Sequence, residues 1–111
     1  SLSGETKIAE LKNGRVTHYT VAPEDFGLKR EPLENIRCLT PQDAKNAALK
    51  VLHDDSSAAT KIVSLNAAAA LYVSGKAHSI KEGVLLAMDA LDGGLVEKKL
   101  KAVADFSRMA A

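Results

Sequence analysis

The sequence predicts a β-hairpin followed by four α-helices, an α+β piece whose sheet is incomplete. Its 111 residues are 46% hydrophobic but only 4% aromatic, so Ala and aliphatic side chains carry the hydrophobic share, which favours helix. A strong β pattern occurs only over about residues 5–22, and helical periodicity follows from about residue 41. A two-stranded hairpin alone is marginal in water. We therefore expect its strands to join a larger sheet that this sequence does not contain.

The hairpin is predicted from two β-rich segments that flank Asn13-Gly14. Asn-Gly supplies the positive φ angles of a type I′ turn, so a two-residue turn joins the strands. Neither face is cleanly polar, and we expect both faces to be partly covered. The register pairs Leu11 with Val16, Ala9 with His18, and Ile8 with Tyr19. One face carries Ala9, Leu11 and Val16, and the other carries Thr6, Ile8, Tyr19 and Val21.

A turn and a loop are predicted between the hairpin and the first helix. Pro and Gly residues punctuate the turn after the second strand, and a helical turn is expected near Leu33–Ile36. The first helix is expected over about residues 41–53, because Thr40 is a favourable N-cap and Pro41 suits the first helical position. It is predicted to bury four residues: Ala44, Ala48, Val51 and Leu52.

The second helix is expected over about residues 58–73, after a polar connector at 54–57. Apolar residues surround this helix, which predicts a central position in the fold. The run Ala67–Ala70 permits another backbone to approach closely, and Gly75 is expected to end the helix. The helical spacing is carried by Ile62, Leu65, Ala69 and Tyr72, with Val63, Ala67, Ala70 and Leu71 beside them.

The third and fourth helices are separated by Gly93-Gly94. The third is expected over about residues 79–92, where Ser79 and Glu82 match a capping box. The fourth is expected over about residues 95–109. The third is predicted to direct inward Ile80, Val84, Leu85, Met88 and Leu91. The fourth presents Val96, Leu100, Val103 and Phe106 on its apolar side, and Lys98, Lys99, Lys101 and Asp105 are expected to face water.

Charge and cysteine content exclude several classes of protein. The net charge of +1 argues against a dedicated nucleic-acid or polybasic membrane surface. A single cysteine excludes an internal disulfide framework and favours a reducing compartment. No apolar run approaches the ~18 residues needed to span a bilayer, and the first residues do not resemble a signal peptide, so a cytoplasmic location is expected. The sequence lacks an initiator Met, and we expect its first residue to be internal to a longer gene product.

The residue pattern assigns no catalytic, cofactor-binding or metal-ligating residue. His18, His53 and His78 have no Cys, His or carboxylate at metal-ligand spacing, which favours structural or surface roles. Cys38 is not part of a Cys-His pattern, and we expect a semi-buried small side chain there.

The carboxylate pairs have structural explanations. Glu24-Asp25 adjoins a turn, where side-chain bonding to the backbone is usual. Asp54-Asp55 is expected to serve helix ends and solubility. Asp89 and Asp92 lie at the unfavourable C-terminal end of a helix, which a solvated face or a cap for the next helix explains.

Three further features give weak indications of binding. Gly4 lies between polar residues that could form an anion-binding turn, but no glycine-rich phosphate loop accompanies it. Asn66 is expected to be a buried amide bonded to neighbouring backbone. Lys98, Lys99 and Lys101 are expected to form a solvated helix face rather than a phosphate track.

Four segments carry a pattern that extends, in order, over essentially the whole chain: Ser3–Leu11, Pro23–Leu28, Leu65–Tyr72 and Ser79–Val84. Together and in this order they resemble the C-terminal part of the anthranilate phosphoribosyltransferase family, within the nucleoside-phosphorylase-like phosphoribosyltransferases. The Pro-Glu-Asp-Phe-Gly-Leu and Asn-Ala-rich segments are the most specific of the set, although neither is a catalytic motif.

The resemblance implies an α/β domain with a mainly parallel mixed sheet, of which this hairpin and these helices are the C-terminal part. It implies an enzyme of tryptophan biosynthesis that transfers the phosphoribosyl group of phosphoribosyl pyrophosphate to the anthranilate amine and releases pyrophosphate. In that family magnesium neutralises the leaving group. The resemblance also implies a homodimer formed through an N-terminal helical domain.

The family's substrate and metal motifs have no counterpart in this sequence. Its glycine-rich phosphate loop, Lys-His-Gly segment and substrate-binding arginine belong to earlier parts of the family's chain. Its Asp-Glu magnesium pair is expected immediately upstream of Ser1. The resemblance therefore carries no catalytic, cofactor or metal residue onto this chain, and no cofactor is expected on this portion alone. Ser1 to Thr6 are expected beside the metal site through their backbone.

Three hypotheses remain open on the sequence alone. The first is a C-terminal portion of this transferase that is inactive by itself. In the second, the same portion works beside a companion chain that supplies the remainder of the α/β domain. The third is a family relative without catalysis that binds nucleic acid, which only the lysines of the fourth helix support.

Overall fold

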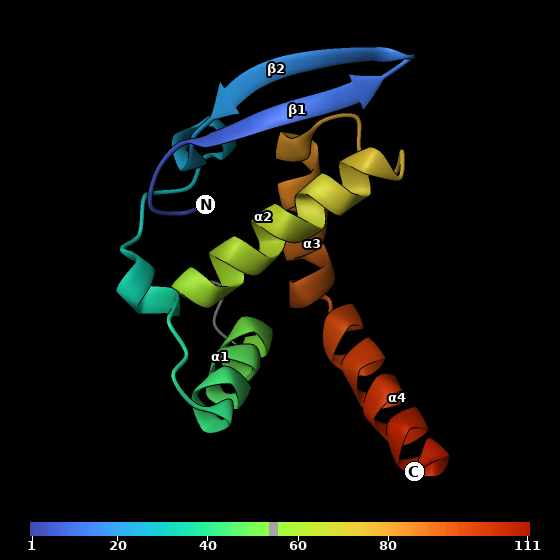
Figure 1. The fold of residues 1–111 in the computed structure, drawn as a ribbon. Helices are drawn as coiled ribbons and strands as arrows, with labels where there is room; N and C mark the ends of the chain where they lie inside the picture. Colours follow the sequence, from blue (N-terminus) through green and yellow to red (C-terminus); the bar gives the residue numbers. More distant parts are fainter. Residues whose placement is uncertain (54–55) are drawn as a thin grey trace.

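The computed structural model describes residues 1–53 and 56–111 and has an antiparallel hairpin lying along one side of four helices (Figure 1). This confirms the predicted hairpin and helices and is consistent with a part of an α/β domain. The elements are β1 (Thr6–Lys12), β2 (Arg15–Val21), the 3-10 turns η1 (Pro23–Phe26) and η2 (Leu33–Ile36), and the helices α1 (Pro41–His53), α2 (Ala58–Val73), α3 (Ile80–Asp92) and α4 (Leu95–Ala110).

The hairpin has the predicted register. Asn13-Gly14 takes φ angles of 52° and 74°, as a type I′ turn requires, and the three expected cross-strand pairs form. Ile8 and Tyr19 are half-buried on the inner face, whereas Leu11 and Val16 on the outer face are 72% and 55% exposed. The expectation that both faces are partly covered is therefore wrong for this structure, because the described helices all lie on the inner side (Figure 1).

Local hydrogen bonds fix the helix starts that the sequence predicts. At α1, the Asp43 backbone N–H donates to Thr40 Oγ1 at 3.1 Å, and the Thr40 N–H donates to Asp43 Oδ2 at 3.0 Å. At α3, the Glu82 N–H donates to Ser79 Oγ at 3.0 Å, but the Glu82 carboxylate accepts from the His78 N–H at 2.8 Å. The predicted capping box thus forms with its return bond displaced by one residue.

Helices α2 and α3 cross at close range because both present small residues at the contact. The buried residues of α2 are Thr60, Ser64 and Ala68, each one turn from the next. A Cβ atom added to Gly83 of α3 would lie 2.7 Å from the Ala68 carbonyl oxygen, so glycine is needed for this approach. The close approach expected along Ala67–Ala70 is confirmed at Ala68.

Some residues predicted to be buried are exposed. Ala44 and Ala48 of α1 are exposed, because α1 packs through a neighbouring stripe that carries the half-buried Ala47 and the buried Val51. Leu85 of α3 is 62% exposed. Helical spacing identifies an apolar stripe but does not say which of two adjacent stripes meets a neighbour. The other predicted inward residues of α1 and α3 are buried or half-buried: Leu52, Ile80, Val84, Met88 and Leu91.

Helix α4 extends away from the other helices after a contact with α3 (Figure 1). Val96 is half-buried beside that contact, and the rest of the predicted apolar side is exposed: Leu100, Val103 and Phe106. The four polar residues predicted to face water do so: Lys98, Lys99, Lys101 and Asp105.

Candidate functional site

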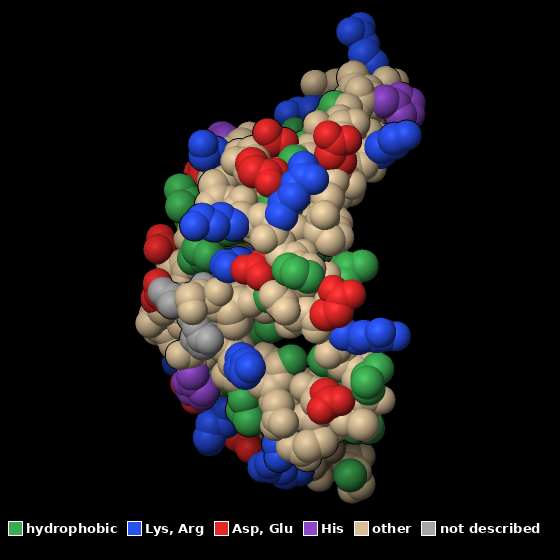
Figure 2. Space-filling model, turned by 90° about the vertical axis from the view of Figure 1, so that its left-hand side faces the viewer, with side chains coloured by type: hydrophobic (Ala, Val, Ile, Leu, Met, Phe, Trp, Pro, Cys, Tyr) green, Lys and Arg blue, Asp and Glu red, His purple; other side chains and the backbone are tan. Residues whose placement is uncertain are grey.

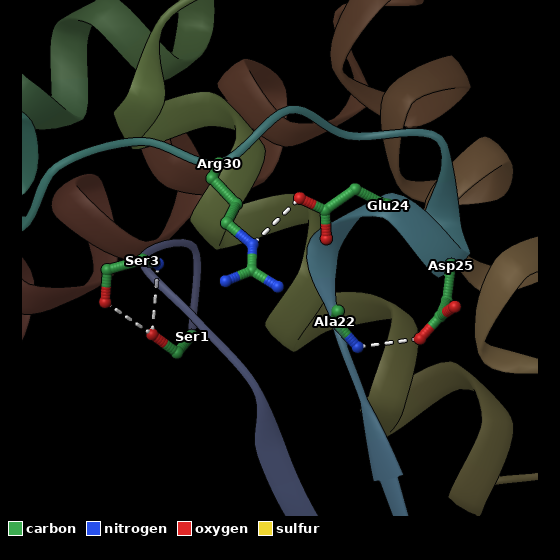
Figure 3. A network of polar contacts seen from close by, with 6 residues as sticks. All are labelled: Ser1, Ser3, Ala22, Glu24, Asp25 and Arg30. Carbon is green, nitrogen blue, oxygen red and sulfur yellow. Dashed lines mark hydrogen bonds and ion pairs between the residues drawn. The ribbon is translucent and has the colours of Figure 1, made fainter.

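The segment before β1 is the first candidate, because the resemblance places it beside a metal site. Leu2 is buried, and its carbonyl accepts from the Glu31 backbone N–H at 3.0 Å. The Ser3 N–H donates to Ser1 Oγ at 3.2 Å, and the two serine hydroxyls are 3.0 Å apart (Figure 3). Leu2 therefore anchors the segment while both serine side chains stay at the surface.

Arg30 lies beside this segment, because the next residue, Glu31, is bonded to it. Arg30 Nε donates to Glu24 Oε1 at 2.9 Å, and Figure 3 shows the guanidinium between Glu24 and the serines. The Ala22 N–H donates to Asp25 Oδ2 at 2.7 Å, which confirms the turn role predicted for Glu24-Asp25. The cluster offers hydrogen-bond donors at the surface, and its carboxylates are already bonded within the chain.

A magnesium ion finds no fitting set of ligands in the part of the chain that the structure describes. Among residues 1–53 and 56–111, no group of three or more His, Cys, Asp and Glu side chains is arranged to hold a metal ion. Gly4 has no positive φ angle, and a Cβ atom there would meet nothing within 4 Å, so it is not a tight backbone cradle. The described residues therefore support no step of chemistry through a bound metal.

A second cluster joins the hairpin to α2 and was missed by the sequence reasoning. The Glu10 carboxylate accepts from Tyr19 Oη at 3.0 Å and from Tyr72 Oη at 2.5 Å. Lys12 Nζ donates to Tyr72 Oη at 3.3 Å and lies 5.4 Å from the centre of that ring. The register sets Glu10 and Tyr19 diagonally on one face, so their contact was predictable, whereas Tyr72 is 62 residues from Glu10 along the chain.

The hydrogen bonds of this cluster change the acidity of two groups. The hydroxyls of Tyr72 and Tyr19 hold the pKa of Glu10 below its ordinary value. Burial, followed by the bond to Glu10, raises the pKa of Tyr19. An open groove of about 480 Å³ beside the cluster is lined by Glu10, Lys12, Asn13, Arg15, Thr17 and Tyr72. These groups suit a structural clamp, since the carboxylate is occupied by two hydroxyl donors.

An ion pair ties the loop before η2 to α2. Lys61 Nζ lies 2.6 Å from Glu31 Oε1, and both side chains are about four-fifths buried. The Asn35 side-chain amide donates to Glu31 Oε2 at 2.9 Å. The Lys61 ammonium, followed by Asn35, holds the pKa of Glu31 below its ordinary value. This cluster joins structural elements. Glu31 and Asn35 also line an open hollow of about 540 Å³, but the Glu31 carboxylate is already bonded to Lys61 and Asn35.

The histidines and the cysteine lie at the surface. His18, His53 and His78 are exposed, which agrees with the predicted surface roles, and His78 Nδ1 is 3.1 Å from Glu82 Oε2. Cys38 is exposed rather than semi-buried, because the loop that carries it lies outside the packed helices.

The remaining weak candidates are also accounted for by local structure. Asp89 and Asp92 are exposed, as a solvated face requires, and Gly94, with no side chain to form a capping bond, occupies the N-cap position of α4. Asn66 donates to the Ile62 carbonyl at 2.8 Å as predicted, but its side chain is exposed, because α2 turns that side away from α3. The prediction for Asp54-Asp55 lies outside the described residues.

A hollow of about 300 Å³ lies where α1, α2 and α3 meet. It combines apolar walls with a few polar groups and is open on one side, and no predicted catalytic pair lines it. Its lining is Val51, Leu52, His53, Thr60, Met88, Leu91 and Asp92.

Basic and acidic side chains are interspersed on the face shown in Figure 2. Lys101 Nζ lies 3.5 Å from Asp105 Oδ2, and Arg108 Nη1 lies 3.3 Å from Asp105 Oδ1, so Asp105 pairs with two of the basic side chains of α4. This arrangement does not form a basic track for a phosphate backbone. No helix within the described residues is long and apolar enough to cross a membrane.

Comparison with known proteins gives the family. A model described as the a/b domain of a glycosyl transferase family matches residues 1–96. The chain is 48% identical over 107 residues to the anthranilate phosphoribosyltransferase of Nitrosomonas eutropha, a match that covers 96% of this chain and 31% of the relative. It is 42% identical over 111 residues to that of Chromohalobacter salexigens, covering all of this chain and 32% of the relative. The protein so named in Methanobrevibacter smithii is 38% identical over 107 residues.

These matches give the class of protein: the chain is part of an α/β transferase domain. The family model covers most of the chain, and the chain therefore belongs to this glycosyl transferase family. It spans about a third of the length of the curated relatives it matches.

Proposed function

We propose that this chain is the C-terminal portion of an anthranilate phosphoribosyltransferase. The whole protein would transfer the phosphoribosyl group of phosphoribosyl pyrophosphate to the amine of anthranilate and release pyrophosphate, a step of tryptophan biosynthesis. One observation carries the proposal: 96% of the chain aligns at 48% identity with a protein of that name.

The chain alone is proposed to be inactive. Its described residues contain no cluster of metal ligands, and its carboxylates are engaged in caps, ion pairs and the clamp at Glu10 or exposed singly. The residues that bind phosphoribosyl pyrophosphate and magnesium would come from the other two thirds of the protein, present in the same polypeptide or as a companion chain. Homodimer formation through that other part and a cytoplasmic location belong to the same proposal.

A complementation assay tests this function. The chain is mixed with the part of the N. eutropha enzyme that lies outside the matched segment, and anthranilate, phosphoribosyl pyrophosphate and Mg²⁺ are added. We expect turnover in the mixture and none from either part alone. Turnover by the chain alone would contradict the proposed inactivity. A mixture that forms a complex but never turns over would contradict the proposed reaction.

No second function is proposed. Only the lysines of α4 would support nucleic-acid binding, and they lie between Glu97 and Asp105 on a chain of net charge +1. A salt-dependent gel shift at low ionic strength would be the check on nucleic-acid binding.

A further inference from the structure

Helix α2 turns its more polar stripe inward and a more apolar stripe outward. The buried stripe facing α3 contains two hydroxyl residues, Thr60 and Ser64, together with Ala68. A surface helix normally shows the opposite arrangement, with apolar residues inward and polar residues outward. The outer stripe of α2, as the name is used below, consists of Val63, Asn66, Ala69, Ala70 and Val73, and each of these residues is exposed.

The outer stripe has the composition of a buried surface. Val63 is 44% exposed and Val73 is 85% exposed. Lys61 is the only charged residue in α2, and it is engaged with Glu31 outside the stripe. The single polar member, Asn66, bonds its amide N–H to the Ile62 carbonyl of the same helix, which lowers the cost of covering it. Figure 1 shows α3 crossing behind α2 and no described element in front of it.

The whole chain also exposes more surface than a complete domain of its size. Its accessible surface is 7986 Å², whereas a folded monomer of 11.7 kDa exposes roughly 5,900 Å² by the usual scaling with mass. An excess of roughly 2,000 Å² on one partner corresponds to roughly 4,000 Å² buried on both partners together, which is in the range of permanent interfaces. A partner surface of that size is therefore missing.

We infer that the outer stripe of α2 is the surface on which the main sheet of the α/β domain packs. This rests on the proposed function, which makes the chain one portion of a longer transferase. The matching family model describes an a/b domain, whereas the described residues contain a sheet of two strands. Helices of such domains cover the faces of the sheet. Ala69 and Ala70 let a flat sheet come near the helix axis, and Val63 and Val73 fill the space on either side.

A binding measurement tests the inference separately from catalysis. The chain is titrated with the part of the N. eutropha enzyme outside the matched segment, and the dissociation constant is measured by sedimentation. Val63→Asp and Ala69→Asp are compared with Met109→Asp, a matched apolar-to-Asp change near the end of α4, away from the outer stripe. We expect each outer-stripe variant to bind at least about tenfold more weakly, because a buried carboxylate lacks a partner, and the control to bind like the original chain.

A second measurement does not depend on how well an Asp variant folds. Ala69→Cys in a Cys38→Ser background is reacted with a thiol reagent. We expect fast labelling of the free chain and protection in the complex. Thermal unfolding of the free Ala69→Asp variant should differ from that of the original chain only by the small cost of Asp within a helix, since Ala69 is exposed in it.

Several results would overturn the inference. Outer-stripe variants that bind within twofold of the original chain would do so, as would equally fast labelling of the Ala69→Cys variant in the complex or a failure of the original chain to bind. A dimer of the chain alone that Val63→Asp abolishes, without binding to the other part, would assign the outer stripe to a second copy instead. If the original mixture binds but never turns over, the proposed reaction fails and the inference stands. If turnover persists in all variants with unchanged binding, the inference fails and the reaction stands.

Discussion

At the scale of single residues, Gly83 sets the distance between α2 and α3. A Cβ atom there would lie 2.7 Å from the Ala68 carbonyl oxygen and 2.8 Å from Ala68 Cα. Both are backbone atoms, so the contact cannot be relieved by a side-chain rotation and the helices must separate. The small residues of α2 are apparent from the sequence, but the role of this glycine is not, because a glycine inside a helix acquires such a role only from its neighbour in space.

We predict that Gly83→Ala destabilises the chain by about 1–3 kcal/mol, the usual cost of overpacking. Alanine favours helix by about 1 kcal/mol over glycine. The sign of the change in the free energy of unfolding therefore shows whether overpacking or helix propensity is the larger effect. Urea unfolding followed by circular dichroism gives the free energy of unfolding. Gly4→Ala is the control, since nothing lies within 4 Å of its added Cβ, and its effect should stay within about 0.5 kcal/mol. A more stable Gly83→Ala chain would contradict this account.

Glu10 is predicted to make stability depend on pH. Two tyrosine hydroxyls lower its pKa in the folded chain, so the folded state favours the carboxylate more than the unfolded state does. Its contribution to stability is complete above the ordinary pKa of a glutamate, about 4.3, and is lost as the pH falls through the pKa of Glu10 in the folded chain. Glu10→Gln should therefore lower the free energy of unfolding at pH 7. The difference in this free energy between the variant and the original chain should become smaller below about pH 4.

Urea midpoints at pH 7 and at low pH measure this gap. Glu31, Asp43 and Glu82 also have lowered pKa values, so their protonation in acid destabilises the variant and the original chain alike. The difference in urea midpoint between the two chains therefore reports on Glu10 alone. Glu97→Gln changes an exposed carboxylate at the start of α4 and serves as the control. A gap that stays constant over this pH range would refute the role of the ionised carboxylate.

At the scale of elements, the bounds of the helices were predictable and their contact faces were only partly so. Thr40-Pro41 and Ser79 determine helix starts through bonds to residues within one turn, so the sequence contains all the needed partners. Which side of a helix is buried depends on elements far along the chain. That is why Ala44 and Leu85 were expected inside and lie at the surface. For the same reason, the contact between Tyr72 and Glu10 could not be predicted from the sequence.

The hairpin is predicted to be held on the helices by the hydroxyl of Tyr72. Tyr72→Phe keeps the ring and removes the bond between α2 and Glu10, so backbone amides in β1 and β2 should exchange hydrogen faster. Tyr19→Phe is a matched control, because its bond to Glu10 joins β1 to β2 and leaves the link to α2 intact. Hydrogen–deuterium exchange with mass spectrometry measures both. Equal acceleration in the two variants, or none in Tyr72→Phe, would show that the clamp does not dock the hairpin.

At the scale of the whole molecule, the chain is more open than a complete domain. Its radius of gyration is 15.5 Å, against about 13 Å for a compact domain of 111 residues. Figure 2 shows the outline hollowed below the projecting hairpin. The sequence predicted this incompleteness from one argument, the isolated hairpin. It could not indicate which surfaces are uncovered, because burial of α2 on one side and exposure on the other follows from packing between distant segments.

We predict that the isolated chain associates with itself as its concentration rises. The outer face of the hairpin exposes Leu11 and Val16 on a sheet with two free edges, and such edges pair readily with further strands. A chain carrying Leu11→Thr and Val16→Thr keeps residues that suit a strand and loses the apolar pair, so it should associate less at equal concentration. Its stability should stay within about 0.5 kcal/mol per change, since both side chains face water. Light scattering over a concentration series measures the association, and a clean monomer of the original chain at high concentration would rule it out.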